Sequence, residues 1–264
     1  MKKYLVIGNP IDHSLSPKLH NYWIKDNNIN ATYEKKKIQE DEIQDLFFNI
    51  KNKTISGINV TVPFKKKVIP FIDELSLEAN TTQSVNTIYI KDDKIVGHNT
   101  DIEGFENSLN HINYNVTGKK VLILGAGGVV PSIIFALNRM KASEIILSNR
   151  TRLKAEKLKN LFKEVNIIDW GEIPNFDIII NATSVGLNNN QEIEIDFSKI
   201  GKNKFFFDVI YNPKQTKFLK SGKKLGSQTE NGKMMFVYQA QKSFQKWHKI
   251  LPNINKKVLD LLDD

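Results

Sequence analysis

Polar side chains that could act together on a small, oxygen-rich molecule follow several apolar runs of the sequence. Asn59 and Lys65 come at the end of one run, Asn86 and Asp101 follow two others, and Ser14 follows the first. Because ligands gather at the strand ends of α/β sheets, we expect these side chains to meet. Their hydroxyl, amide, ammonium and carboxylate groups suit a small polyhydroxylated acid.

A glycine-rich turn, Gly125-Ala126-Gly127-Gly128, indicates a second site. It follows an apolar run and opens a helical pattern, which is the context that a dinucleotide fingerprint requires. The glycines permit a tight turn and let the backbone approach a pyrophosphate, while the start of the helix adds positive potential. A purely structural turn is the alternative, but the strand, turn and helix in sequence favour nucleotide binding.

The end of the next apolar run bears on which nucleotide binds. It reads Asn149-Arg150-Thr151, followed by Lys154. An NAD enzyme usually places Asp or Glu here to bind the ribose 2′-hydroxyl, and no carboxylate is present. The Arg150 guanidinium could instead pair with a 2′-phosphate. A charged helix start on the surface is the alternative, but the pattern favours NADP over NAD.

The elements that must position these groups alternate between strand and helix. Residues 4–7 predict a first strand, Ser16 with Pro17 predicts a capped helix start, and residues 87–90 and 94–97 predict a hairpin. Further strands are expected at residues 121–124, 144–148, 176–181 and 205–209, and helices at 133–140, 152–162 and, with a break at Pro252, 234–262. Alternating strands and helices predict an α/β fold with a parallel sheet.

Length and composition exclude several classes of protein. A chain of 264 residues predicts about two domains, and 40% hydrophobic with 25% charged residues excludes disorder, collagen and coiled coil. The absence of cysteine excludes disulfides, thiolate metal sites and a thiol nucleophile. The net charge of +9 comes from scattered lysines, so compositional drift explains it better than a nucleic-acid-binding stripe.

Targeting and metal signals are equally sparse. No run approaches the ~20 apolar residues of a membrane helix, and the first apolar run is too short for a signal peptide. The five histidines show no metal-ligand spacing, so no metal is expected. We expect a cytoplasmic protein, a monomer or homodimer, that binds a small molecule and neither nucleic acid nor membrane.

Taken together and in order, the motifs resemble those of the shikimate dehydrogenase family, essentially from end to end. They are Ser14-Leu15-Ser16, the run from Asn59 to Lys65, Val85-Asn86-Thr87, Asn99-Thr100-Asp101, Gly125 to Gly128, Asn149-Arg150-Thr151, Asn181 to Gly186, Asp208 to Pro213, and Gln239-Ala240. Any one of these would be weak evidence, but the ordered set is specific.

The resemblance implies NADPH-dependent reduction of 3-dehydroshikimate to shikimate, a step towards chorismate and the aromatic amino acids. It implies a substrate-binding α/β domain of residues 1–103 plus 234–264, and a Rossmann-type, doubly wound NADP-binding domain of residues 104–233. The C-terminal helix returns to the first domain. The implied substrate-binding residues are Ser14, Ser16, Asn59, Thr61, Lys65, Asn86, Asp101, Tyr211 and Gln239. The implied cofactor-binding residues are Gly125, Ala126, Gly127, Gly128, Val129, Asn149, Arg150, Thr151, Lys154, Val209 and Gly232.

Lys65 and Asp101 are the implied catalytic pair. Reducing a ketone needs a hydride, which the cofactor supplies, and a proton for the developing alkoxide. We expect Lys65 to donate that proton and stabilise the alkoxide, with Asp101 orienting Lys65 and binding a hydroxyl group. Which of the two is the proton donor stays open at this point.

The sequence departs from the family pattern at Val129, Val130 and Pro131 after the glycine-rich turn, and at Met234, where a glycine is common. None of these departures removes a polar catalytic group. Three alternatives remain: a quinate or quinate/shikimate dehydrogenase, a catalytically silent NADP-binding regulator of the same fold, and a basic nucleic-acid-binding protein. The first would favour an acid near Arg150, the second has no need of both Lys65 and Asp101, and the third lacks a recognised motif.

Overall fold

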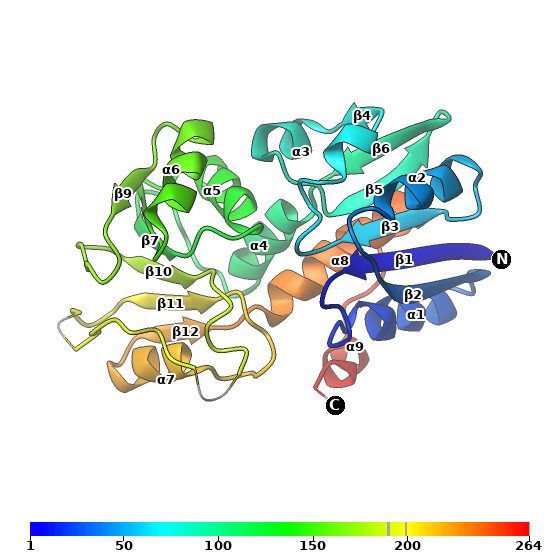
Figure 1. Ribbon diagram of the computed structural model, residues 1–264. Coiled ribbons are helices and arrows are strands. Elements are labelled where there is room, and N and C mark those ends of the chain that lie inside the picture. The colour runs from blue at the N-terminus through cyan, green and yellow to red at the C-terminus, as the bar shows by residue number, and fades with distance from the viewer. Residues whose placement is uncertain (189–190, 199, 264) are drawn as a thin grey trace. The chain divides into compact units, whose positions relative to one another are not determined.

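The computed structural model describes residues 1–188, 191–198 and 200–263. The chain forms two compact units (Figure 1). Unit 1 comprises Met1–Gly104 and Val237–Asp264, and unit 2 comprises Phe105–Phe236. The chain therefore leaves unit 1 within helix α4 (Asp101–His111) and returns to it within helix α8 (Lys233–His248).

Unit 1 is built on a six-stranded mixed sheet in the order β2-β1-β3-β5-β6-β4. Its strands are β1 (Lys2–Gly8), β2 (Ala31–Lys37), β3 (Gly57–Val60), β4 (Glu74–Leu75), β5 (Thr87–Lys91) and β6 (Lys94–His98). Strand β5 runs antiparallel to both β3 and β6, and the other pairs are parallel. The expected hairpin forms because Asp92 and Asp93 both take positive φ angles, as a tight two-residue turn requires.

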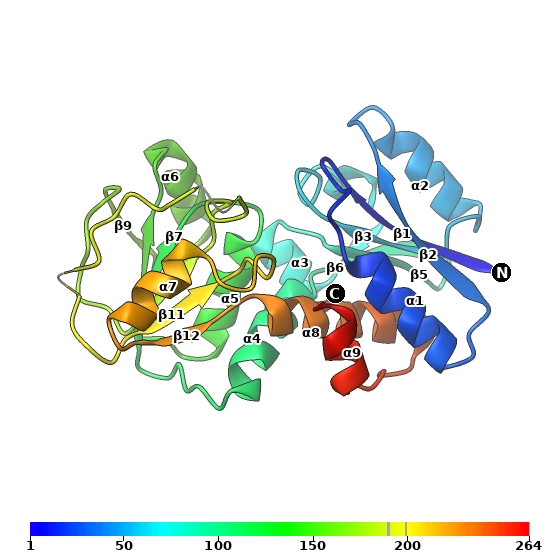
Figure 2. The same cartoon turned by 90° about the horizontal axis from the view of Figure 1, so that it is seen from below.

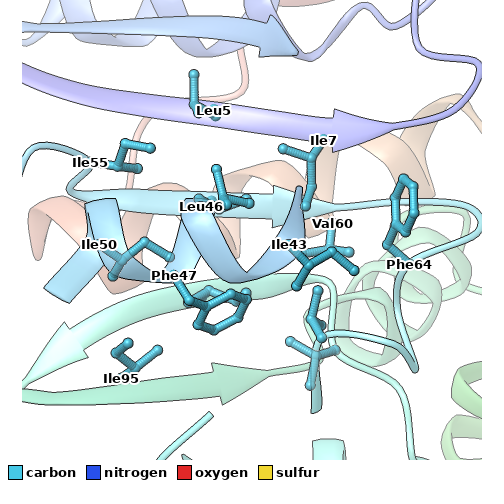
Figure 3. Packing of buried hydrophobic residues seen from close by; sticks show 14 of the residues in the cluster. Leu5, Ile7, Ile43, Leu46, Phe47, Ile50, Ile55, Val60, Phe64 and Ile95 are labelled. Atoms are coloured by element: carbon cyan, nitrogen blue, oxygen red, sulfur yellow. The ribbon is translucent and has the colours of Figure 1, made fainter. Parts of the chain in front are cut away.

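One face of this sheet is covered by helix α2 (Ile43–Lys51). Its buried residues Ile43, Leu46, Phe47 and Ile50 recur at helical spacing and belong to one core cluster with Leu5, Ile7, Ile58 and Val60 of the strands (Figure 3). Helix α3 (Leu77–Thr82) and a short 3-10 turn, η1 (Ile69–Phe71), complete this part of the unit. The apolar face of α2 thus fixes the strands whose ends carry the polar candidates.

Helices α1 (Ser16–Asp26), α8 and α9 (Lys256–Leu261) belong to the other side of the sheet (Figures 1 and 2). Trp247 of α8 donates from its indole nitrogen to the carbonyl of Ile88 at 3.0 Å. A Cβ on Gly57 would lie 2.3 Å from that nitrogen, so only glycine lets α8 lie this close to β3. The α8 helix is therefore held against β3 and β5.

The start of α1 differs from the expected cap. The N-cap position is Leu15, and no side chain caps the helix. Ser16 is the first helical residue, and Pro17 lies in the first turn, where its missing N–H costs nothing. The expectation that Ser16 caps the helix is wrong, because the N-cap is one residue earlier, at Leu15, and Ser16 already lies in the first turn.

Unit 2 contains a six-stranded, all-parallel sheet in the order β12-β11-β10-β7-β8-β9. Its strands are β7 (Lys120–Leu124), β8 (Glu144–Ser148), β9 (Asn166–Ile168), β10 (Ile178–Asn181), β11 (Phe205–Asp208) and β12 (Gln228–Glu230), with helices α5 (Val130–Arg139), α6 (Arg152–Leu161) and α7 (Lys217–Lys224). Numbered within the unit, the strands follow the order 3-2-1-4-5-6 of doubly wound dinucleotide-binding sheets. The strands remain parallel, and the order in which the chain visits them reverses between β7 and β10.

Both faces of the unit 2 sheet are apolar, as expected for a parallel sheet covered by helices. Phe206 lies in a core cluster with Phe218 and Leu219 of α7, while Phe207 contacts Phe105 of α4 edge-on, with ring centroids 5.2 Å apart. Val130, one of the departures from the family pattern, is fully buried at the start of α5.

In the described part of the chain, no helix is long and apolar enough to cross a membrane. The same residues contain no group of three His, Asp or Glu side chains arranged to hold a metal ion.

Candidate active site

A nearly buried ion pair lies at the centre of the polar cluster in unit 1. Lys65, in the turn after β3, donates from Nζ to Oδ2 of Asp101, the first residue of α4. Their side chains are 12% and 9% exposed. Because little water screens the two charges, the pair interacts more strongly than an ordinary surface ion pair. The backbone N–H of Val85 also donates to the carbonyl of Lys65 at 2.9 Å, which anchors the turn.

The side-chain amide of Asn86 fixes the second oxygen of the same carboxylate. Its Nδ2 donates to Oδ1 of Asp101 at 2.8 Å and to Oε1 of Gln239 at 3.4 Å. Its Oδ1 accepts the backbone N–H of Thr100 at 2.7 Å. A backbone N–H can only donate, so the oxygen of Asn86 must face Thr100 and its NH₂ group must face Asp101. Asp101 is thereby held by a different donor on each oxygen.

Asn59 lies directly beside this group because of the strand register. The antiparallel pairing of β3 with β5 sets Asn59 opposite Thr87. The Nδ2 of Asn59 donates to the carbonyl of Asn86 at 3.0 Å, and its Oδ1 accepts the hydroxyl of Tyr33 at 2.7 Å. Burial raises the pKa of Tyr33 well above its usual value, so this hydroxyl remains protonated and able to donate.

The two candidate serines lie at the other end of the cluster. The backbone N–H of Ser16 donates to Oγ of Ser14 at 3.3 Å, and the hydroxyl of Ser16 is hydrogen-bonded to Tyr33. Thr61 follows β3 and accepts the N–H of Phe64 at its carbonyl. An open hollow of about 680 Å³ is lined by Asp12, His13, Ser14, Leu15, Pro17, Lys18, Tyr33, Glu34 and Lys35. Its lining includes Ser14 but neither Lys65 nor Asp101, so the buried ion pair defines the candidate site better than the hollow does.

In unit 2 the glycine-rich turn lies at the reversal point of the sheet, between the ends of β7 and β10. Gly125 takes a φ of +114°, and a Cβ there would lie 2.8 Å from the carbonyl oxygen of Ala182. Gly127 and Gly128 are exposed just before α5. Exposed backbone at the start of a helix, at this point of a doubly wound sheet, is where a dinucleotide phosphate binds. Ala126 and Val129 are partly buried in the same turn.

The loop after β8 contains an exposed arginine, Arg150, that can bind an anionic ligand. Within the described residues, Arg150 is exposed and makes no ion pair, whereas Arg152 pairs with Asp169 and with Glu156. The Nδ2 of Asn149 donates to the carbonyl of Thr151 at 2.8 Å and shapes the loop. Lys154 is also exposed, one turn into α6. The loop can therefore present a guanidinium and an ammonium to an anionic ligand.

The remaining candidates of unit 2 follow β11 and precede α8. A Cβ on Gly232 would lie 2.1 Å from the carbonyl oxygen of Val209, so a glycine is required for this close contact. Tyr211 stacks on Phe236, with ring centroids 4.7 Å apart. Met234, which departs from the family pattern, is buried at the start of α8.

Asp208 organises the loop that carries Val209. Its carboxylate accepts hydrogen bonds from Nδ2 of Asn181, the N–H of Ile210 and the hydroxyl of Thr216. Burial raises the pKa of Asp208 to about 6, and these three bonds oppose that rise.

The structure thus groups Lys65, Asn86, Asp101 and Gln239, with Asn59 adjacent and the serines joined through Tyr33. The cofactor candidates and Tyr211 all belong to unit 2. Sequence reasoning missed Tyr33 and Ser243, which are both bonded to Asn59. The only signal for Ser243 was its position one helical turn after Gln239, and Tyr33 carried none.

Comparison with known proteins shows the family of the chain. Residues 6–88 match the family described as "Shikimate dehydrogenase substrate binding domain", and residues 107–217 match "Shikimate / quinate 5-dehydrogenase". The chain is 62% identical to a shikimate dehydrogenase (NADP(+)) of Pelagibacter ubique, over 99% of each protein.

Solved structures resemble the whole chain as well. Shikimate dehydrogenase of Aquifex aeolicus superposes with a TM-score of 0.92 at 34% identity, covering 100% of this chain and 98% of that one. Shikimate 5-dehydrogenase of Thermus thermophilus, solved with NADP(H) and shikimate, gives a TM-score of 0.88 at 27% identity and covers 96% and 95%. The chain belongs to the shikimate dehydrogenase family.

Proposed function

We propose that this protein catalyses the reversible, NADPH-dependent reduction of 3-dehydroshikimate to shikimate. The observation that carries the proposal is the buried arrangement of Lys65, Asp101 and Asn86 in the substrate unit. The chain is also 62% identical to a shikimate dehydrogenase (NADP(+)). An ammonium and a carboxylate held this way suit proton exchange with a small hydroxylated acid.

Lys65 and Asp101 form the catalytic pair in this proposal. NADPH, when bound, supplies the hydride that reduces the carbonyl carbon. Negative charge then develops on the carbonyl oxygen, and the Lys65 ammonium stabilises it and donates the proton. Asp101 fixes Nζ of Lys65 and accepts a substrate hydroxyl. In the direction of shikimate oxidation, neutral Lys65 removes the hydroxyl proton.

The other polar groups of unit 1 bind the substrate. Ser14 and Ser16 bind its carboxylate through hydroxyl groups at the start of α1. The ring hydroxyls contact Asn59, Thr61, Asn86 and Gln239. Tyr211 of unit 2 is a further proposed substrate contact. Most of these residues lie in loops or near strand ends, where side chains can reach a ligand, while Ser16 begins α1 and Gln239 lies in α8.

Unit 2 binds NADP(H). The turn formed by Gly125, Ala126, Gly127, Gly128 and Val129 receives the pyrophosphate. Asn149 shapes the loop in which Arg150, Thr151 and Lys154 bind the 2′-phosphate. Val209 and Gly232 would hold the nicotinamide end of the cofactor. The absence of a carboxylate in the sequence 149–154 supports NADP over NAD.

The test is spectrophotometric. Purified protein is mixed with shikimate or quinate and with NADP⁺ or NAD⁺, and absorbance of the reduced nicotinamide is followed. We expect rapid reduction only with shikimate and NADP⁺. Preference for quinate and NAD⁺ would instead indicate a quinate dehydrogenase. No turnover in any of the four pairs, with NADP⁺ still bound, would indicate a catalytically silent regulator.

We further propose a cytoplasmic location and a monomeric or homodimeric state. A biosynthetic reduction that draws on NADPH fits the cytoplasm. Light scattering of the purified protein and fractionation of cells that produce it measure the two properties separately.

A further inference from the structure

Helix α8 presents three polar or amphipathic side chains in one stripe toward the unit 1 sheet. Gln239, Ser243 and Trp247 are spaced four residues apart, so they share a helix face. Gln239 bonds Asn86, Ser243 bonds Asn59, and Trp247 bonds the carbonyl of Ile88. Ser243 is fully buried and lies in the middle of this stripe.

The hydroxyl of Ser243 belongs to a ring of three hydroxyl groups. Its Oγ lies 2.7 Å from Oγ1 of Thr87 and 3.1 Å from Oγ1 of Thr100, and the two threonine oxygens are 3.2 Å apart. Both threonines also lie within hydrogen-bond distance of Oδ1 of Asn86, at 2.9 and 3.1 Å. The ring therefore touches the amide that holds Asp101.

Part of the hydrogen bonding around this ring has a fixed direction. Nδ2 of Asn59 faces the carbonyl of Asn86, which only accepts, and donates its other hydrogen toward Oγ of Ser243 at 2.9 Å and Oγ1 of Thr87 at 3.2 Å. The Ser243 hydroxyl donates to the backbone carbonyl of Gln239 at 3.0 Å and also lies against Oγ1 of Thr87, and Thr87 contacts Oδ1 of Asn86.

These contacts form a continuous hydrogen-bonded network that reaches the candidate catalytic carboxylate. It links the Tyr33 hydroxyl with Asn59, Ser243, Thr87 and Asn86, and the amide of Asn86 donates to Asp101. Buried groups in one network polarise one another and hold a single arrangement more firmly than isolated bonds do.

We propose that Ser243 is a positioning residue: the backbone N–H of Thr100 orients the Asn86 amide, and Ser243 holds that amide in place through the threonine hydroxyls, and with it the Asp101 carboxylate against Lys65. This rests on the proposed function, in which Lys65 and Asp101 exchange the proton. Ser243 does not touch the substrate in this account. Its contribution is made through the interior of the unit.

Removal of the hydroxyl by Ser243→Ala leaves Asn59 and Thr87 each short of one partner. The Asn86 amide keeps its bond from the N–H of Thr100, but the hydroxyl groups packed against it can shift, and its position against Asp101 shifts with them. Because a displacement of about 1 Å at a reacting group can cost about 100-fold in rate, we expect kcat to fall about 10- to 100-fold. The KM for shikimate is expected to change less than kcat, because Asn59 and Asn86 are only part of the set that binds the substrate.

Three further variants separate positioning from general stability. Ser243→Thr keeps the hydroxyl and is expected to recover most of kcat. Thr87→Val removes the next hydroxyl in the network at nearly constant volume. The double variant Ser243→Ala, Thr87→Val is expected to be little slower than the slower single variant, because both break the same network.

The matched control is Ser108→Ala, in which a buried helical serine loses a hydroxyl that donates to the carbonyl of Phe105 in its own helix. It is expected to lose stability without losing kcat. If wild-type protein does not oxidise shikimate, the proposed function fails, and this role fails with it. If wild-type protein is active but Ser243→Ala keeps its kcat, or if the two single effects simply add, only the positioning role is overturned.

Discussion

A buried histidine makes unit 1 sensitive to acid. His20 of α1 is 1% exposed, and neither of its ring nitrogens has a hydrogen-bond partner among the residues that the structure describes. Its ring stacks on Tyr33, with centroids 4.2 Å apart and planes 4° from parallel. Burial, with a smaller contribution from His248, lowers the pKa of His20 to about 3.

The sign of the effect follows from comparing the two states. In the unfolded chain His20 has a pKa of about 6.5, so it takes up a proton as the pH falls below that value, whereas the folded protein does not until about pH 3. The contribution of His20 to the free energy of unfolding is therefore fully present above about pH 6.5, and it decreases progressively as the pH falls toward 3. Between pH 7 and pH 5 the loss amounts to about 2 kcal/mol.

The variant His20→Phe keeps a ring against Tyr33 and cannot titrate. We expect its free energy of unfolding to fall about 2 kcal/mol less than that of the wild type between pH 7 and pH 5. At pH 7 it is expected to be at least as stable as the wild type, because two unsatisfied buried nitrogens are removed.

The assay is urea unfolding followed by tryptophan fluorescence in a Trp170→Phe background. The remaining tryptophans, Trp23 and Trp247, both belong to unit 1, so the signal reports the unit that contains His20. His13→Gln, at an exposed histidine, is the control and should leave the pH dependence unchanged. Equal losses of stability in wild type and His20→Phe would refute the reasoning.

Two further predictions concern the cofactor loop and the contact beneath α8. Arg150→Ala is expected to raise the KM for NADP⁺ at least about tenfold, because a charge-assisted bond to the 2′-phosphate is lost, and to change the KM for NAD⁺ little. Arg152→Ala is the control and should change neither KM, because Arg152 is already paired with Asp169. Gly57→Ala is expected to destabilise unit 1 by about 1–3 kcal/mol in urea unfolding, because its Cβ would meet the indole of Trp247. Gly201→Ala should be close to neutral, because its Cβ would lie at an ordinary contact distance of 3.9 Å from the flexible side chain of Lys204. Equal effects for the members of either pair would contradict these contacts.

The regular parts of the fold were predictable from local pattern. Strands β7, β8, β10 and β11 lie within two residues of their expected bounds, because short apolar runs between turn signals predict buried strands. The hairpin of β5 and β6 was predictable from Asp92 and Asp93. The short strands β4 and β12 were not expected, because edge strands of two or three residues carry little pattern.

The residue types of the candidate site were predictable from the sequence, but the hydrogen bonds between them were not. Lys65, Asn86 and Asp101 follow strand-like runs, so their convergence could be expected from the sequence. The bond between Asn59 and Ser243 joins residues 184 positions apart and depends on how α8 packs on the sheet. Packing between segments so far apart cannot be deduced from a single sequence, so Tyr33 and Ser243 were identified only in the structure.

In the proposed mechanism Lys65 exchanges the proton with the substrate oxygen. This role is measured by kcat for shikimate oxidation by NADP⁺ in the Lys65→Met variant beside the wild type, with Asp101→Asn as its partner. We predict a fall in kcat of about 100- to 10,000-fold for Lys65→Met, with far less change in the KM for shikimate. A Lys65→Met enzyme that retains the wild-type kcat would show that Lys65 does not exchange the proton.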